Sequence, residues 1–181
     1  NAPEISSLPA SGIPRVWLQG DPVESWKKDE VCIFEFWATW CGPCLAAIPH
    51  LNALHRQISD EKLPARIVGV NVFDESSPAR LKKFLAARPV PPEYAVAIDA
   101  EKTATREWLR PLNVSGIPFA LAARGGRILW KGNPNALSPE LLRALCDENF
   151  SQEKRKSETR KREGAARAEM RRILKLHADG D

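Results

Sequence analysis

The stretch that decides the fold is Trp37-Ala38-Thr39-Trp40-Cys41-Gly42-Pro43-Cys44. It follows residues 31–37, a nearly continuous apolar run of β-branched and aromatic residues that predicts a strand buried on both faces of a sheet. Apolar side chains then recur at helical spacing, at Cys44, Ile48, Leu51, Leu54 and Ile58. This pattern predicts a helix that begins near Cys44 and bends at Pro49. The two cysteines therefore lie between a buried strand and the mouth of a helix.

The two thiols are one helical turn apart, and this geometry permits a tight, reversible disulfide. The partial positive charge and the amide N–H groups at the start of a helix stabilise a thiolate, which can lower a cysteine pKa from about 8.5 to roughly 3.5–7.5. Cys41 is therefore the candidate nucleophile. Cys44 lies inside the first turn and is placed to attack a mixed disulfide between Cys41 and a substrate, which makes it the candidate resolving cysteine.

Two other interpretations of the cysteine pair are a zinc half-site and a structural disulfide. Zinc would need about two more ligands, and the remaining candidates have no paired spacing: Cys32, Cys146, His50, His55 and His177. A disulfide that closes so small a loop would stabilise the fold little. We therefore expect redox chemistry, with no metal and no organic cofactor. Cys32 and Cys146 are expected to pack as small apolar residues.

The rest of the chain alternates strand and helix signals. Further strands are predicted at residues 66–72, 94–98, 119–123 and 128–131, the last two forming a hairpin around Gly125-Gly126. Helices are predicted after Ser77-Pro78 and Ser138-Pro139, where a capping serine precedes a proline, and around residues 102–109. The order βαβαβαββα predicts an α/β fold whose sheet is parallel in its first part and closed by an antiparallel hairpin.

Composition divides the chain into three segments. We predict an extended N-terminal arm over residues 1–14, the α/β domain over residues 15–150, and a long charged helical tail over residues 151–181. The formal net charge is +4; residues 1–150 hold 17 basic and 17 acidic side chains, whereas the tail holds 10 and 6. Because the body lacks the basic excess that phosphate binding needs, nucleic acid is not expected as a partner.

Membrane and export signals are absent from the sequence as given. No apolar run approaches the roughly 20 residues needed to cross a bilayer, and the N-terminus lacks the basic and then apolar layout of a signal peptide. Because the chain opens with Asn1 rather than Met, we expect that upstream sequence was removed, so the absence of a signal or an anchor here proves little.

The segment from Glu35-Phe36-Trp37-Ala38 to Pro49, together with Ile117-Pro118, resembles the thioredoxin superfamily. Three further features resemble its TlpA/ResA-type, extracytoplasmic branch: the inserted segment 72–93, the Trp17-Leu18 entry, and the hairpin strand Gly126-Arg127-Ile128-Leu129-Trp130. The resemblance covers roughly residues 15–148. It implies a thioredoxin-like fold with a central mixed sheet flanked by helices, to which the charged C-terminal helix is added.

The resemblance implies a proton-carrying role for Glu35, which falls where thioredoxins carry a buried acid beneath the active site. A carboxylate within an apolar strand has its pKa raised toward neutrality and can accept the proton of the resolving thiol, Cys44. The alternative is that Glu35 faces solvent at a sheet edge.

The resemblance also implies a substrate-binding surface around the cysteines. Ile117-Pro118 matches the family's cis-proline loop, which offers backbone to an extended substrate strand; Phe119 departs from the small residue that many relatives carry there. Trp40 would cap the disulfide, with Gly42 and Pro43 between the cysteines as further substrate contacts. Ordinary core packing is the alternative for Trp40 and for its neighbour Trp37.

We predict a thiol-disulfide oxidoreductase that acts on protein disulfides, and the Gly42-Pro43 dipeptide, as in reducing thioredoxins, favours a reductase fed by an upstream thiol electron donor. The expected location is extracytoplasmic, either periplasmic or secreted, with any membrane anchor upstream of residue 1. The alternative function is an interaction module whose basic tail docks on a partner or an anionic membrane surface. A peroxidase is excluded, because Phe34 and Ala38 stand where a peroxidatic Cys41 would need Pro and Thr.

Overall fold

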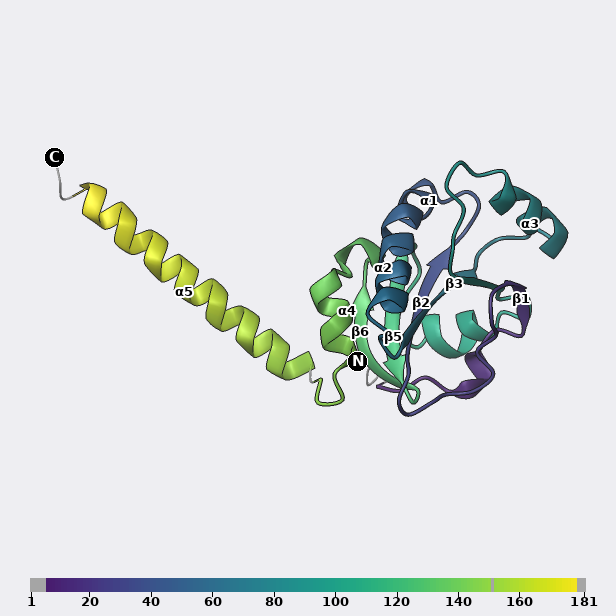
Figure 1. Cartoon of the computed structure of the whole chain (residues 1–181), viewed down its shortest axis with the longest axis horizontal. Coiled ribbons are helices and arrows are strands. Elements are labelled where there is room, and N and C mark those ends of the chain that lie inside the picture. Colours follow the sequence, from purple (N-terminus) through teal and green to yellow (C-terminus); the bar gives the residue numbers. More distant parts are fainter. Residues whose placement is uncertain (1–5, 151, 179–181) are drawn as a thin grey trace. The chain divides into compact units, whose positions relative to one another are not determined.

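Six strands form one mixed sheet in the computed structural model, which describes residues 6–150 and 152–178 (Figure 1). The strands are β1 (Val16–Gln19), β2 (Val31–Trp37), β3 (Ala65–Asn71), β4 (Ala95–Ile98), β5 (Phe119–Arg124) and β6 (Arg127–Gly132). Their order across the sheet is β1-β4-β3-β2-β5-β6. The pairs β2/β3 and β3/β4 are parallel, whereas β1/β4, β2/β5 and β5/β6 are antiparallel. This arrangement confirms the predicted thioredoxin-like mixed sheet.

The helices that position the site are α1 (Gly42–Ala46), α2 (Ile48–Asp60), α3 (Pro78–Ala86) and α4 (Pro139–Cys146). Both predicted serine caps form: Ser77 Oγ accepts a hydrogen bond of 3.3 Å from Arg80 N–H, and Ser138 Oγ accepts one of 3.1 Å from Leu141 N–H. The predicted bend near Pro49 is a break between α1 and α2, at Ala47. Proline cannot donate the hydrogen bond that would carry α1 smoothly into α2.

Two elements differ from the sequence-based expectation. β1 was not predicted, because all four of its residues are only partly buried at a sheet edge and give no alternating pattern. The helix expected over residues 102–109 is a short π-type turn, η2 (Thr105–Leu109). The Asp99 carboxylate accepts hydrogen bonds of 2.8 and 2.9 Å from the backbone N–H groups of Ala104 and Thr105, which fixes the start of this turn.

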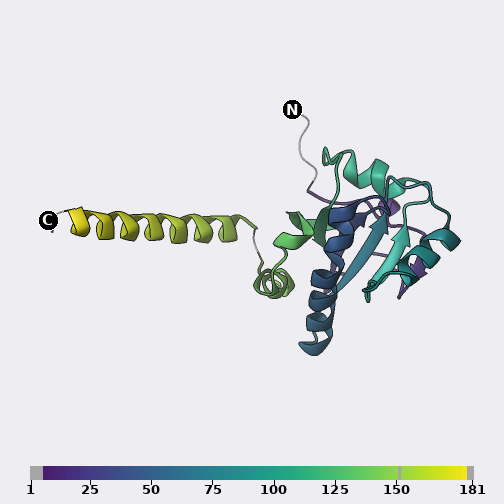
Figure 2. The ribbon, with the colours of Figure 1, turned by 90° about the horizontal axis from the view of Figure 1, so that it is seen from above.

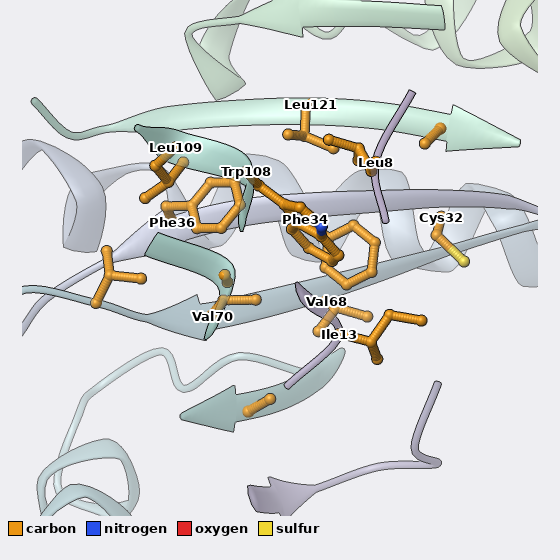
Figure 3. Packing of buried hydrophobic residues seen from close by; sticks show 14 of the residues in the cluster. Leu8, Ile13, Cys32, Phe34, Phe36, Val68, Val70, Trp108, Leu109 and Leu121 are labelled. Atoms are coloured by element: carbon orange, nitrogen blue, oxygen red, sulfur yellow. The ribbon is translucent and has the colours of Figure 1, made fainter. Parts of the chain in front are cut away.

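The two faces of β2 serve different purposes. Phe34 and Phe36 face a cluster in which Trp108 is fully buried, with the Phe34 and Trp108 ring centroids 4.9 Å apart (Figure 3). Burying side chains of this size contributes about 1.5–3 kcal/mol each to stability. Trp37 belongs to a second cluster, which contains both Cys41 and Cys44. β2 thus anchors the core with one face and carries the redox site with the other.

The N-terminal segment is more than an extended arm. Leu8 and Ile13 are buried in the same cluster as Trp108 (Figure 3). Leu8 N–H donates a hydrogen bond of 2.7 Å to Gly126 O, and Trp108 Nε1 donates one of 2.9 Å to Pro9 O. The arm expected over residues 1–14 is therefore corrected for residues 7–14, because two isolated apolar side chains complete the core without a periodic pattern. Residues 1–5 lie outside the described part of the chain.

The chain divides into two units, residues 1–148 and residues 149–181. The described part of the second unit contains the helix α5 (Gln152–Ala178), which Figure 2 shows from the side along its full length. It confirms the predicted C-terminal charged helix, although Ser151 lies outside the described residues. The side chains of residues 157 and 160–175 are exposed. The predicted boundaries after residues 14 and 150 stay predictions. Within the described residues, no helix combines the length and apolar character that a bilayer crossing requires.

Candidate active site

Cys41 and Cys44 form a disulfide at the junction of β2 and α1, with their Cα atoms 5.3 Å apart. β2 ends at Trp37 and α1 begins at Gly42, so a short turn over residues 38–41 delivers the first cysteine to the helix. Cys41 is the N-cap of α1, and its sulfur accepts a hydrogen bond of 3.3 Å from the Cys44 backbone N–H. An amide at a helix N-terminus is therefore directed at the Cys41 sulfur, which favours a thiolate there.

The disulfide itself is shielded, but its surroundings are open. Cys41 is 3% exposed and Cys44 is 1% exposed, whereas Trp40 is 63% exposed. Gly42 and Pro43, between the two cysteines, are exposed as well. Trp40, Gly42 and Pro43 therefore form an exposed rim around the shielded disulfide.

Glu35 is a buried acid on the central strand. It is 2% exposed, and burial raises its pKa to about 8 although a hydrogen bond from Tyr94 lowers it. The Tyr94 hydroxyl donates to Glu35 Oε1 at 3.2 Å. Glu35 Oε2 is buried without a hydrogen-bond partner among the described residues. The alternative of a solvent-facing edge residue is wrong, because β2 lies inside the sheet and is buried along its whole length.

Glu35 and Cys44 both line a small cavity of about 10 Å³. Its lining comes from β2, α1, α2, α3, β4 and the loop between α3 and β4: Glu35, Trp37, Cys44, Leu45, Ile48, Leu85, Pro92, Tyr94 and Val96. This volume is about the smallest in which one water molecule fits. A single water in the cavity would be able to carry a proton between the Cys44 sulfur and the Glu35 carboxylate.

The loop that precedes β5 packs against the cluster that contains the two cysteines. The Ile117–Pro118 peptide bond is cis, as the resemblance implied. Ile117 packs against the buried cluster that contains both active-site cysteines. Phe119, the departure from the family pattern, is partly exposed and stacks on Phe36 with ring centroids 6.0 Å apart. Residues far apart in the sequence are thus brought to one site.

Sequence reasoning missed Asp74, which holds the active-site turn. Its Oδ2 accepts two hydrogen bonds of 2.8 Å from the backbone N–H and the hydroxyl of Thr39, and one of 3.2 Å from Asn71 Nδ2. Oδ1 accepts a bond of 3.0 Å from Ser76 N–H. Burial acts to raise the pKa of Asp74, but the hydrogen bonds outweigh it and hold the pKa well below its usual range. No local motif signals this role, because pairing of β2 with β3 brings Thr39 and Asp74 together.

Phe73 was also missed, although it completes the exposed part of the site. Its φ of 53° lies in the left-handed region that residues other than glycine rarely adopt. Its carbonyl accepts a hydrogen bond of 2.9 Å from Trp40 Nε1, and its side chain is 41% exposed. Trp40 and Phe73 therefore present two linked, exposed aromatic side chains beside the disulfide; we call them the Trp40–Phe73 pair.

The other two cysteines are not part of this site. Cys32 is buried on β2, and burial, followed by the charge of Glu30, raises its pKa to about 12. Cys146 is partly buried at the end of α4, where burial also raises its pKa. Thiols that stay protonated are poor nucleophiles. In residues 6–150 and 152–178, no group of three or more His, Cys, Asp or Glu side chains is arranged to hold a metal ion.

This fold, with a Cys-x-x-Cys disulfide at the start of a helix, defines a thioredoxin-like domain. Residues 23–84 match the Thioredoxin family. A thiol:disulfide interchange protein DsbE from Chlorobium tepidum is 27% identical, with a TM-score of 0.52 and coverage of 66% of this chain and 82% of that chain. StoA from Bacillus subtilis shares the fold at 17% identity, with a TM-score of 0.55 and coverage of 75% and 96%. The predicted thioredoxin-like fold is confirmed, and the predicted resemblance to thioredoxins is confirmed for residues 23–84.

Curated relatives match a limited segment. Sulfhydryl oxidase 1 from Cavia porcellus is 31% identical over 85 residues, which are 46% of this chain and 14% of that protein. The thioredoxin-like protein CITRX, chloroplastic, from Solanum tuberosum is 35% identical over 83 residues, 45% of this chain and 44% of that protein. The chain thus spans less than half the length of these two relatives.

Proposed function

We propose that the protein reduces disulfides in other proteins, with Cys41 as the nucleophile and Cys44 as the resolving cysteine. The observation that carries this proposal is the Cys41–Cys44 disulfide at a helix N-terminus, above a buried acid and beside an exposed aromatic pair. The Thioredoxin family match over residues 23–84 supports it.

The reaction has two exchange steps. The Cys41 thiolate attacks one sulfur of a substrate disulfide, so a mixed disulfide forms and the other substrate sulfur leaves as a thiolate. The Cys44 thiolate then attacks the Cys41 sulfur, which forms the Cys41–Cys44 disulfide and releases the second substrate sulfur. Two electrons pass from the dithiol to the substrate, and an upstream protein dithiol returns them to this site.

Glu35 serves the second step in this proposal. A carboxylate accepts the Cys44 proton, and a group whose pKa lies near the working pH does so effectively. Burial raises the pKa of Glu35 to about 8, and the cavity of about 10 Å³ offers a path for one water between Glu35 and Cys44.

The substrate-binding residues proposed are Trp40, Gly42 and Pro43 on one side of the disulfide and Ile117 with Pro118 on the other. The first three are exposed and the last two are half-buried. Backbone beside a cis-proline is suited to pairing with an extended chain. The partner is therefore a protein segment in extended conformation that carries a disulfide.

The proposed location is extracytoplasmic, periplasmic or secreted, supported by the 27% identity to a DsbE protein. The tail is proposed to make contacts that the reaction does not need. Basic side chains are exposed along residues 160–175, and such a helix can bind an anionic surface. Deletion of residues 151–181 should leave disulfide reduction unchanged but abolish any salt-sensitive binding to anionic lipid vesicles.

The deciding experiment is reduction of insulin disulfides with dithiothreitol, comparing the wild type with Cys41→Ser and Cys44→Ser, followed by the redox potential against glutathione. Loss of activity in Cys41→Ser together with a potential more reducing than the glutathione pool supports the reductase. An oxidising potential would reassign the protein as an oxidase or isomerase. Activity that does not depend on the cysteines would leave the interaction module as the better proposal.

A further inference from the structure

We propose that Tyr94 is a positioning residue for the resolving step: its hydroxyl binds Glu35 Oε1 and so leaves Oε2 as the oxygen that takes the proton of Cys44. This inference rests on the function proposed above. It concerns a residue that no sequence motif selected and that donates directly to the buried acid at 3.2 Å.

Gly69 makes room for this contact. It is the partner of Glu35 in the β2/β3 register. A Cβ atom at Gly69 would lie 2.7 Å from Glu35 Oε1 and 3.2 Å from Tyr94 Cε2. Any larger residue would therefore push the carboxylate and the phenol ring apart. The pairing of a glycine with a buried acid leaves space that the Tyr94 side chain enters.

Tyr94 can act only as a donor at this position. It is 1% exposed, and burial, followed by the charge of Glu35, raises its pKa well above the usual value. The hydroxyl therefore keeps its proton and has one O–H to donate, which Oε1 receives. When Glu35 is neutral, its own proton consequently resides on Oε2, the oxygen without a hydrogen-bond partner among the described residues.

The surroundings contain few other titratable groups. β5 places Ala120 opposite Glu35, and β3 places Gly69 there. Four of the residues that line the cavity carry a polar side-chain group: Glu35, Tyr94, Cys44 and Trp37, whose indole N–H is a donor. Tyr94 donates its hydrogen bond to Glu35, so the proton transfer of the resolving step is assigned to one acid, the donor bound to it and one thiol.

The proposed step is balanced within these groups. The Cys44 S–H bond breaks and its proton moves through a water in the cavity to Glu35 Oε2, while Tyr94 stays hydrogen-bonded to Oε1. The Cys44 thiolate attacks the Cys41 sulfur of the mixed disulfide, and the substrate sulfur departs with the electron pair of the broken S–S bond. The proton leaves Glu35 when the site is next reduced and Cys44 becomes a thiol again.

Tyr94→Phe tests this inference, because it removes the donor and keeps the ring. The side-chain carboxyl of Glu35 is titrated by ¹³C NMR in the full chain, and the rate of insulin reduction is measured from pH 6 to 10. We expect the pKa of Glu35 to rise by about one unit, because a hydrogen bond to the charged form is lost. The rate at pH 7 should fall about tenfold, the change that one pKa unit produces.

Three control variants make the test specific. Val96→Ala enlarges the same cavity without removing a donor, so the pKa of Glu35 should stay unchanged or fall. In a Glu35→Gln background, Tyr94→Phe should no longer move the pH–rate profile. The proposed role of Tyr94 would be overturned if Tyr94→Phe left the pKa of Glu35 unchanged. It would also be overturned if Tyr94→Phe still shifted the pH–rate profile in the Glu35→Gln background. Undiminished activity in Cys44→Ser would instead overturn the resolving step, and with it the proposed function.

Discussion

The carboxylate of Asp74 holds Thr39 by two hydrogen bonds of 2.8 Å, one from its backbone N–H and one from its hydroxyl. Thr39 is two residues before Cys41, the proposed nucleophile, so this contact fixes the turn that carries this cysteine. The hydrogen bonds form best to an ionised carboxylate, which is why the pKa of Asp74 is held low against the effect of burial.

Asp74→Asn should destabilise the protein by about 1–3 kcal/mol at pH 7, because an amide cannot accept every bond that the carboxylate accepts. Asp74 has a lowered pKa in the folded state, so its contribution is present above the ordinary Asp pKa of about 3.9 and is lost as the pH falls below it. Urea unfolding at pH 7 and at pH 3 checks this. Glu75→Gln, at a neighbouring position 92% exposed in its side chain, is the control and should change little. Equal destabilisation by Asp74→Asn at both pH values would contradict the prediction.

Glu35→Gln should stabilise the protein increasingly as the pH rises. Burial raises the folded-state pKa of Glu35 to about 8, so unfolding releases a proton between the ordinary Glu pKa of about 4.3 and pH 8, and the wild type loses stability across that window. Glutamine removes the cost of ionisation, which is on the order of 3–5 kcal/mol above pH 8.

Urea unfolding of both proteins at pH 5, 7 and 9 measures this difference. Insulin reduction should change in the opposite sense, because the same substitution removes the proton acceptor of Cys44. A stability difference that does not vary with pH would show that Glu35 is not neutral in the folded protein at pH 7.

Gly69→Ala should destabilise the protein by about 1–3 kcal/mol through overpacking, because the new Cβ would lie 2.7 Å from Glu35 Oε1. The double variant Gly69→Ala with Glu35→Ala should recover part of this loss, and a double-mutant cycle measures the coupling. Gly116→Ala is the matched control, because no atom lies within 4 Å of a Cβ there. If the effects of Gly69→Ala and Glu35→Ala on the free energy of unfolding simply add, the strain does not arise from the contact between residues 69 and 35.

The fold could be predicted where local pattern and burial agree. The run Val31 to Trp37 is apolar apart from Glu35 because the strand is buried on both faces, and Ser77 and Ser138 signal the helix starts that they cap. β1 could not be predicted, because a partly buried edge strand carries no alternation. Leu8 and Ile13 were assigned to an arm, because isolated apolar residues join a core through tertiary contacts alone.

Some residues of the candidate site could be predicted from local sequence, and others could not. Cys41, Cys44 and Glu35 stand within one continuous stretch, so motif and strand pattern identify them together. Asp74 lies 35 residues from Thr39, and Tyr94 lies 59 residues from Glu35. These contacts exist only after β3 and β4 take their places beside β2, so no local signal could reveal them.

The Trp40–Phe73 pair should bind protein substrates without taking part in the chemistry. Trp40→Ala should raise KM for insulin by at least about fivefold, the effect of removing an aromatic side chain worth more than 1 kcal/mol at an interface, and Phe73→Ala should act in the same direction. Stability should fall by only about 0.5–1.5 kcal/mol in Trp40→Ala, because the side chain is 63% exposed and loses one hydrogen bond.

A small disulfide separates docking from chemistry in these variants. Reduction of a disulfide too small to reach Phe73 should proceed at nearly the wild-type rate in Phe73→Ala, while insulin reduction falls. Trp40→Phe retains an aromatic ring but loses the Nε1 hydrogen bond to Phe73 O, so it should keep most of the affinity for insulin if the ring makes the contact. The reduction of insulin and of the small disulfide could instead slow equally in Phe73→Ala. Phe73 would then act through the geometry of the active-site turn, because only a change at Cys41 itself would slow the reduction of every disulfide alike.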